Sequence, residues 1–228
     1  MSGYKILLFD NDGTLMDFEK AQEQALKLTC GEMGAPYGEE VRDAYSRIND
    51  GWWKRMEKGE CLKDELQIGR FADFTRAFAF RGDPVEWNRR YMENLGKGSF
   101  LLPQAEEVCR VLSRRYRLYV VTNGVAVTQY RRIQHSAYFP YIQGIFVSEE
   151  AGAPKPSRAY FDYVFSRLPG EKPEDMLLIG DSPSADLLGA NRAGIDCCWY
   201  NPGGLDLPAG VFCSFQIRSL SELIEKLA

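Results

Sequence analysis

Histidine is the scarcest chemically versatile residue in this chain, which has only His135 among 228 residues. That scarcity excludes a metal site built from several histidines, and a Ser-His-Asp triad would depend on one residue in a polar, helix-like stretch. The six cysteines form no CxxC pair and show no spacing suited to zinc, so we expect them to be reduced and mostly buried. Any metal site should therefore use oxygen ligands, which favour Mg²⁺ or a similar hard cation.

Long apolar runs are also lacking. No stretch approaches the roughly 20 residues that a helix needs to cross a bilayer, and the apolar run within Met1 to Phe9 is too short for a signal-peptide core. We therefore expect a cytoplasmic protein without membrane contact. An excess of positive charge is missing too, because 28 basic residues face 32 acidic ones, for a formal net charge of -4. This charge balance argues against nucleic acid as a partner. The sequence gives no indication of the oligomeric state.

Short apolar runs alternate with helical patterns from about residue 100 onward. Such alternation is typical of a parallel sheet with crossover helices. We therefore predict an α/β fold with a Rossmann-like parallel core. The expected strands are 5–9, 118–121, 145–147, 176–179, 197–200 and 212–217. The expected helices are 105–114, 158–168, 185–193 and a last helix with a capping box at Ser219 and Glu222.

The segment from about Phe18 to Leu95 has a different character. It is richer in charged and aromatic residues, has helix-like spacing and contains no convincing β run. It starts directly after the first expected strand and ends near the flexible stretch Gly96 to Gly98. We therefore predict two domains, an α/β core formed by residues 1–17 and 97–228 and a helical insertion formed by residues 18–96.

Two carboxylates, Asp10 and Asp12, lie two residues apart at the end of the first expected strand. Strand alternation points both side chains the same way, and ligands of open α/β sheets bind beyond the carboxyl ends of strands. At about 4 Å and an effective dielectric near 20, two such charges repel by roughly 4 kcal/mol. A metal ion or a lysine is therefore expected beside them. Taken alone, the pair could equally be a solvated turn or a helix cap.

Three further clusters follow other expected strands. Thr122 and Asn123, with the next glycine, offer a hydroxyl and backbone N–H groups to phosphate oxygens. Lys155 lies between two prolines, which restrict the backbone around a cation. Asp181 and Asp186 add two more carboxylates after an apolar run. Each cluster alone has a plainer interpretation, as a capping turn, a solvent-facing lysine or a helix N-cap.

The combination, in this order and at strand ends, resembles the four motifs of the haloacid dehalogenase superfamily: an aspartate-rich first strand, a Thr or Ser, a Lys and a terminal acidic pair. The resemblance covers the whole α/β portion and implies phosphoryl transfer. It gives Asp10 the role of a nucleophile that forms an aspartyl-phosphate, and Asp12 the role of general acid and then general base. Thr122, Asn123 and Lys155 would hold the phosphoryl oxygens.

The same resemblance implies a Mg²⁺ site. Its expected ligands are Asp10, the Asn11 backbone carbonyl, Asp12 and Asp181, with Asp186 binding directly, through water or as a support behind the ligands. Asp12 also separates branches of the superfamily, because dehalogenases keep no aspartate at that position and use no magnesium. A phosphatase is therefore favoured. The phosphonate-cleaving branch would need an imine-forming lysine in the insertion, and no signature singles one out.

An insertion directly after the first motif corresponds to the helical cap of this superfamily, which closes over small substrates. Segments of the cap and its flanks, among them Asn49 to Trp53 and SEEAGAPK at 148–155, look like the bacterial house-cleaning pyrimidine 5'-nucleotidases. We therefore expect a small phosphorylated metabolite as substrate, with a nucleoside 5'-monophosphate favoured. Trp52, Trp53 and Arg70 are candidate substrate contacts, although adjacent tryptophans in a helical region are also typical of a cap core.

Three alternatives stay open at this point. A sugar-phosphate phosphatase or a phosphoglucomutase would use the same core, and only the cap would distinguish it. A receiver-type signalling domain also combines acidic residues, Thr and Lys on a parallel sheet, but it needs only about half this length and no insertion. A non-catalytic phosphoacceptor or binding protein would not need the complete set of catalytic residue types.

Overall fold

The computed structural model describes residues 3–227 of the chain. Contacts divide the chain into two compact units, one formed by residues 1–18 and 99–228 and the other by residues 19–98. We call the first the core unit and the second the cap unit. No helix formed within residues 3–227 is long and apolar enough to span a membrane.

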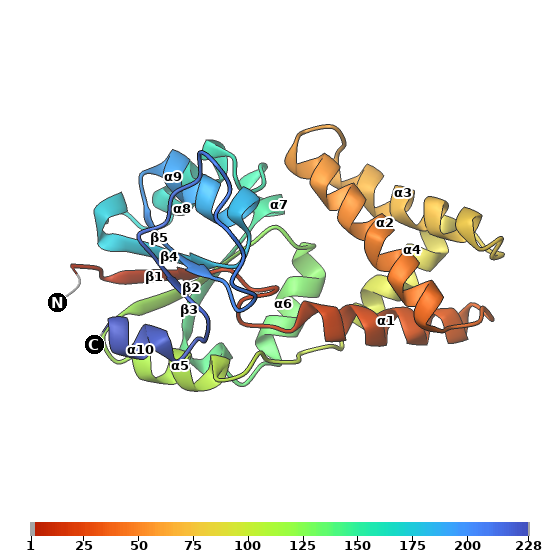
Figure 1. Ribbon diagram of the computed structural model, residues 1–228, viewed down its shortest axis with the longest axis horizontal. Coiled ribbons are helices and arrows are strands. Elements are labelled where there is room, and N and C mark those ends of the chain that lie inside the picture. The colour runs from red at the N-terminus through yellow and green to blue at the C-terminus, as the bar shows by residue number, and fades with distance from the viewer. Residues whose placement is uncertain (1–2, 228) are drawn as a thin grey trace. The chain divides into compact units, whose positions relative to one another are not determined.

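A six-stranded sheet forms the centre of the core unit (Figure 1). The strand order is β3-β2-β1-β4-β5-β6, and each neighbouring pair is parallel. The predicted α/β fold with a parallel sheet is therefore confirmed. The strands are β1 (Ile6–Phe9), β2 (Arg117–Thr122), β3 (Ile142–Val147), β4 (Met176–Gly180), β5 (Asp196–Tyr200) and β6 (Phe215–Ile217).

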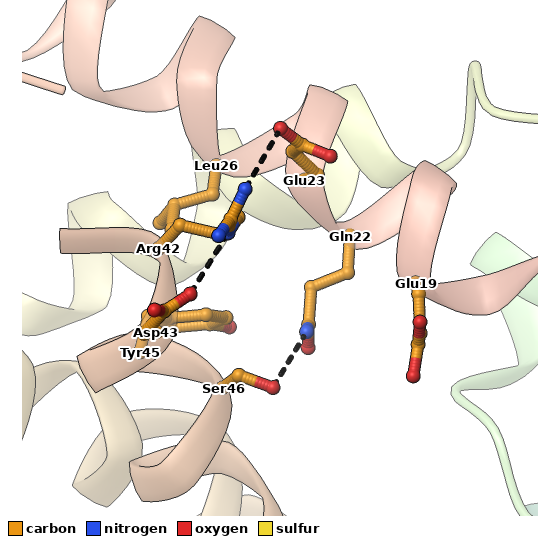
Figure 2. A pocket seen from close by; sticks show the side chains of 8 residues that line it. All are labelled: Glu19, Gln22, Glu23, Leu26, Arg42, Asp43, Tyr45 and Ser46. Carbon is orange, nitrogen blue, oxygen red and sulfur yellow. Dashed lines mark hydrogen bonds and ion pairs between the residues drawn. The ribbon is translucent and has the colours of Figure 1, made fainter. Parts of the chain in front are cut away.

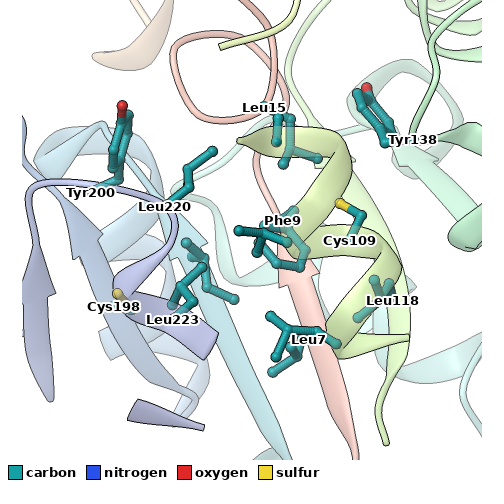
Figure 3. Close-up of a cluster of buried hydrophobic side chains, with 14 of the residues drawn as sticks. Leu7, Phe9, Leu15, Cys109, Leu118, Tyr138, Cys198, Tyr200, Leu220 and Leu223 are labelled. Carbon is teal, nitrogen blue, oxygen red and sulfur yellow. The ribbon is translucent and has the colours of Figure 1, made fainter. Parts of the chain in front are cut away.

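Successive strand residues point to opposite faces of this sheet, and each face packs against its own hydrophobic cluster. On β1, Leu7 and Phe9 belong to one hydrophobic cluster, whereas Ile6 and Leu8 belong to another. Figure 3 shows the first cluster, which joins strand residues to side chains from a helix after the cap and from the C-terminal segment. The helices of the core unit are α5 (Ala105–Leu112), α6 (Ala126–Gln134), α7 (Ser148–Ala151), α8 (Arg158–Ser166), α9 (Leu188–Ala193) and α10 (Glu222–Lys226).

Three neighbouring strands end at the same edge of the sheet. β1 lies between β2 and β4, and all three run in the same direction. β1 leads into Asp10, β2 ends at Thr122 and β4 leads into Asp181. The topology therefore brings together residues that are far apart in the sequence, at the edge where ligands of open α/β sheets bind.

The segment after β4 differs from the single helix expected over 185–193. Pro183–Leu187 forms one turn of π-helix, and α9 continues from there. The Ser182 carbonyl accepts the N–H groups of both Asp186, at 2.9 Å, and Leu187, at 3.2 Å. Turns of this kind are frequent at functional sites. The expected strand 212–217 is also shorter, because Phe212 is 70% exposed and pairing begins only with β6.

The cap unit is built from helices that pack around aromatic side chains. Five buried rings from three of its helices lie with neighbouring centroids 5.3 to 6.2 Å apart. The abundance of aromatic residues in this segment therefore serves the core of the cap. The helices are α1 (Phe18–Glu32), α2 (Glu39–Glu57), α3 (Lys63–Ala77) and α4 (Pro84–Leu95), and the rings are Tyr45, Phe71, Phe74, Trp87 and Tyr91.

Candidate active site

Lys155 is the centre of the candidate site and lies between two aspartates of the core unit. Its ammonium nitrogen is 2.6 Å from Asp10 Oδ1 and 2.7 Å from Asp186 Oδ1, and it donates to the Val121 carbonyl at 3.0 Å. The lysine side chain is only 2% exposed. Although burial lowers the pKa of Lys155, the two aspartates reverse that shift and raise it. Lys155 is therefore a charged cation held away from solvent.

Asn123 holds the backbone of this lysine from the neighbouring strand end. Its Nδ2 donates to the Lys155 carbonyl at 2.9 Å, and its Oδ1 accepts the Lys155 N–H at 2.8 Å. The side-chain amide of Asn123 therefore anchors Lys155, and the predicted contact of Asn123 with phosphate oxygens, which rests on its backbone N–H group, stays a prediction. Thr122, at the end of β2, accepts the Gly124 N–H on its Oγ1 at 3.0 Å, which leaves its hydroxyl proton as a donor for another oxygen.

A third carboxylate, Asp181, joins Asp10 and Asp186, and we call these three residues the acidic group. One carboxylate oxygen of each lies within 4.8 Å of the others. Asp181 is held at both ends, because Thr14 Oγ1 donates to its Oδ1 at 3.3 Å and the Trp199 indole donates to its backbone carbonyl at 3.0 Å. These two bonds therefore fix Asp181 beside the other two carboxylates.

Two glycines make room for the acidic group. A Cβ on Gly13 would lie 2.5 Å from Asp181 Oδ2, and a Cβ on Gly180 would lie 2.3 Å from Asp186 Oδ2. Gly13 also has a φ of +84°, a conformation that other residues adopt only with strain. A side chain at either position would displace a carboxylate of the acidic group.

The charges of the site do not balance without a further cation. With all groups ionised, three carboxylates and one ammonium leave a formal charge of -2. Burial raises the pKa of Asp10 well above its usual value, Lys155 opposes the shift, and Asp186 and Asp181 add to it. Burial, with help from Asp186, raises the pKa of Asp181 to about 7. A divalent cation would neutralise the remaining charge, and carboxylate oxygens are ligands that Mg²⁺ prefers, so these residues fit Mg²⁺.

Asn11 does not fit the role of a metal ligand that the sequence suggested. Its backbone carbonyl accepts the N–H groups of Leu15, at 2.9 Å, and Met16, at 2.8 Å. A carbonyl oxygen has two lone pairs, so both are used in the turn that follows β1. The Asn11 side chain is fully buried and is bonded to Tyr138 and Gln129. The expected ligation by Asn11 is therefore corrected, and this residue belongs to the turn.

The Asp12 carboxylate is also separate from the acidic group. Arg132 Nη1 is 2.5 Å from its Oδ1, and Gln129 Nε2 donates to its Oδ2 at 2.6 Å. Both oxygens of the Asp12 carboxylate are engaged by side chains of α6, so the expected metal ligation by this carboxylate is corrected, and the carboxylate is held apart from the acidic group. Sequence reasoning missed Gln129 and Arg132. Their spacing of three residues, on a helix that follows Thr122, was the available signal, because it places both on one helix face.

Arg70, a candidate substrate contact, lies in the core of the cap unit. It is 2% exposed and donates to Asn49 at 2.9 Å and to Asn88 at 3.0 Å. Its guanidinium also lies over the Tyr91 ring, 4.9 Å from the centroid. Arg70 therefore joins three cap helices, and its expected role as a substrate contact is corrected on grounds of burial.

The two tryptophan candidates are half-buried and pack against a small hydrophobic cluster of the cap. The Trp52 indole donates to Asp73 at 3.0 Å, and its ring fills the space above Gly69, where a Cβ would lie 2.2 Å from ring carbons. Trp52 therefore joins α2 to α3. Trp53 packs against the same cluster from the next position of α2.

A hollow of about 310 Å³ lies between α1 and α2 of the cap unit (Figure 2). Three of the eight residues that line it are acidic, and the Gln22 amide and the Ser46 hydroxyl face each other across it at 3.5 Å. Arg42 is engaged by Asp43 at 2.9 Å and by Glu23 at 3.8 Å. Sequence reasoning did not single out any of these residues. Helical spacing alone does not distinguish them from a solvated face.

Comparisons with known proteins place this arrangement in a family. A family model for haloacid dehalogenase-like hydrolases matches residues 4–194. The protein YfnB of Bacillus subtilis, described as a HAD-hydrolase, is 37% identical over 223 residues, which cover 98% of this chain and 95% of YfnB. The magnesium-bound crystal structure of YfnB superposes with a TM-score of 0.94 and covers 98% of both chains.

Two further relatives are named as pyrimidine 5'-nucleotidases. PynA of Streptococcus pneumoniae is 33% identical over 225 residues, which cover 98% of this chain and 95% of PynA. YjjG of Escherichia coli is 25% identical over 221 residues, which cover 97% of this chain and 96% of YjjG. With the acidic group and Lys155 at the sheet edge and a family match over most of its length, the chain belongs to the haloacid dehalogenase-like hydrolases.

Proposed function

We propose that this hydrolase is a magnesium-dependent phosphatase that removes phosphate from small phosphomonoesters through an aspartyl-phosphate on Asp10. The observation that carries the proposal is the acidic group around Lys155 at the edge of the parallel sheet. A nucleophilic carboxylate, a cation beside it and oxygen ligands for Mg²⁺ are the groups that this chemistry needs. Nucleoside 5'-monophosphates are the favoured substrates.

Each residue of the site has a distinct task in this proposal. Asp10 attacks phosphorus, and the Thr122 hydroxyl donates to a phosphoryl oxygen. Lys155 supplies positive charge beside the nucleophile, because its three N–H groups already point to two carboxylates and a carbonyl. The acidic group would hold a magnesium ion, which would neutralise charge on the transferred phosphoryl group. Asp12 protonates the leaving oxygen in the first step and takes a proton from the attacking water in the second.

The nucleotide preference rests on the relatives and not on the geometry of the core. Two relatives that cover almost the whole chain, including the cap unit, are named as pyrimidine 5'-nucleotidases. Substrate selection in a capped enzyme depends on the cap, because the core supplies only the groups that act on phosphate. A sugar-phosphate phosphatase or a phosphoglucomutase would use the same core and is the alternative.

A panel of phosphomonoesters tests the proposed function. It contains pyrimidine and purine nucleoside 5'-monophosphates and several sugar phosphates, each assayed for phosphate release with Mg²⁺ and with EDTA. We expect the highest kcat/KM with a nucleotide and loss of turnover in EDTA. Much faster turnover of a sugar phosphate would reject the nucleotide preference, and formation of an isomer in place of free phosphate would indicate a mutase. Absence of magnesium-dependent turnover on every ester would reject the phosphatase.

Magnesium should also stabilise the folded chain, and more strongly near neutral pH than in acid. Burial raises the pKa of Asp181 to about 7 from its usual 3.8. Without metal, and at a pH between these two pKa values, the folded protein therefore holds a proton on Asp181 that the unfolded chain lacks. The free energy of unfolding then falls as the pH rises toward 7. Magnesium competes with that proton. At a free concentration about 100 times Kd it should add about 2.7 kcal/mol.

The measurement is the Tm with Mg²⁺ and with EDTA, at about pH 5 and at about pH 7.5, either side of most of the Asp181 titration. The increase caused by magnesium should be larger at the higher pH. Asp181→Asn removes both the ligand and the titrating group, so this variant should lose most of the increase at both pH values. An equal increase at both pH values in the unmodified protein would contradict proton competition at the acidic group.

A further inference from the structure

The two oxygens of the Asp12 carboxylate are held by one helix, α6. Arg132 Nη1 is 2.5 Å from Oδ1, and Gln129 Nε2 is 2.6 Å from Oδ2. Arg132 is fully buried and Gln129 is 3% exposed, whereas the Asp12 side chain is 23% exposed. The solvent-facing carboxylate is therefore bonded from its buried side by two side chains that have little freedom to move.

Gln129 is itself oriented by a chain of hydrogen bonds that begins at Tyr138. The Tyr138 hydroxyl donates to Asn11 Oδ1 at 2.5 Å, and Asn11 Nδ2 donates to Gln129 Oε1 at 2.6 Å. All three side chains are buried. The chain Tyr138, Asn11, Gln129, Asp12 therefore runs from the hydrophobic cluster of Figure 3, to which Tyr138 belongs, to the carboxylate of Asp12.

The direction of this chain follows from the chemistry of its last member. An ionised carboxylate only accepts hydrogen bonds, so Gln129 must turn its NH₂ group toward Asp12 and its oxygen toward Asn11. Asn11 must then donate its NH₂ group to Gln129 and present its oxygen to the Tyr138 hydroxyl. Each amide has one orientation that satisfies both neighbours. The chain thus specifies Gln129 as a donor to Asp12.

Gly124 leaves room for the contact between Gln129 and Asp12. A Cβ on Gly124 would lie 2.2 Å from Gln129 Nε2 and 2.5 Å from its Cγ. A side chain at position 124 would therefore occupy the path that Gln129 takes toward Asp12. The glycine after Thr122 and Asn123 has a function in addition to forming the turn at the end of β2.

We propose that Gln129 and Arg132 are positioning residues for Asp12, and that Asn11 and Tyr138 act through Gln129. The proposal rests on the function proposed above, in which Asp12 protonates the leaving oxygen. A carboxyl group that is free to rotate would spend little time in line with that oxygen, and misplacement by about 1 Å can cost 10²-fold in rate. Two bonds to rigid, buried partners hold the carboxylate in one orientation.

Leaving-group dependence separates positioning of an acid from a merely structural role. A nucleoside 5'-monophosphate releases an alkoxide that needs a proton, whereas p-nitrophenyl phosphate releases a phenolate that leaves without one. For Gln129→Met we expect kcat/KM to fall by about 10²-fold with the nucleotide, or with the best alkyl ester of the panel, and by less than about 10-fold with p-nitrophenyl phosphate. Tyr138→Phe should show a smaller loss with the same selectivity.

The controls assign each outcome to one proposal. Gln134→Met makes the same change at an exposed position of α6 and should alter neither rate. Asp12→Asn provides the reference for loss of the acid. Suppose that Gln129→Met lowers kcat/KM equally with both esters, whereas Asp12→Asn lowers it mainly with the alkyl ester. That result would overturn the positioning role of Gln129 and leave the acid role of Asp12 intact. If Asp12→Asn itself shows no selectivity, the acid role of Asp12 in the proposed function fails. If Gln129→Met does not fold, the same comparison on Tyr138→Phe decides.

Discussion

Replacing Asp10 with asparagine is expected to lower magnesium-dependent phosphate release by at least about 10⁴-fold, the scale of loss when a covalent nucleophile is removed. Asparagine keeps the size of the side chain but cannot form the aspartyl-phosphate. The fold should persist. Without metal, we expect the Tm of Asp10→Asn to be at least that of the unmodified protein, because burial raises the pKa of Asp10 and so disfavours its charge.

Phosphate release and trapping of the intermediate together measure this effect. Rapid acid quenching of the unmodified enzyme with substrate, followed by peptide mapping, should place the phosphoryl group on the peptide that carries Asp10. The variant should trap none. Asp64→Asn makes the same change at an exposed position in the first turn of α3 and should keep full activity. Full magnesium-dependent activity in correctly folded Asp10→Asn would mean that Asp10 is not the nucleophile.

The main residues of the core site could be predicted because a parallel sheet gathers strand ends. Asp10, Thr122 and Asp181 each follow a short apolar run, so identifying the runs as parallel strands was enough to bring the three residues to one edge. Lys155 was recognisable from its two prolines and from the resemblance. The structure added its partners, since it lies within 2.7 Å of two carboxylates that are 31 and 145 positions away.

The errors concern groups whose role depends on partners that are distant in sequence. Arg132 bonds an aspartate 120 positions away, and a charged residue on a helix gives no local sign that it is buried. Arg70 was misplaced for the same reason, because its asparagine partners come from two other helices of the cap. The role of Asn11 could be assigned only from the hydrogen bonds of the turn after β1, because these bonds determine whether its carbonyl is available to a metal. Periodicity locates elements but not the bonds between them.

Replacing Lys155 with methionine is the second change with a large expected effect. The variant removes the ammonium that bonds Asp10 and Asp186 and leaves buried carboxylates without that compensation. Breaking a buried ion pair from one side costs about 3–5 kcal/mol, so we expect a marked loss of Tm in EDTA. The loss should be smaller in acid, because the raised pKa values of Asp10 and Asp181 let the acidic group take up protons.

Stability and activity of Lys155→Met should respond differently to magnesium. A divalent cation held by the acidic group restores part of the charge balance, so Mg²⁺ should recover much of the lost Tm. Activity should stay about 10²–10³-fold lower at saturating Mg²⁺, the usual cost of removing one group that stabilises charge in the transition state. Lys172→Met, at an exposed lysine, is the matched control and should change neither quantity. A Lys155→Met protein as stable as the unmodified chain in EDTA would contradict the ion pairs, whereas full activity with Mg²⁺ would contradict the role of the lysine in catalysis.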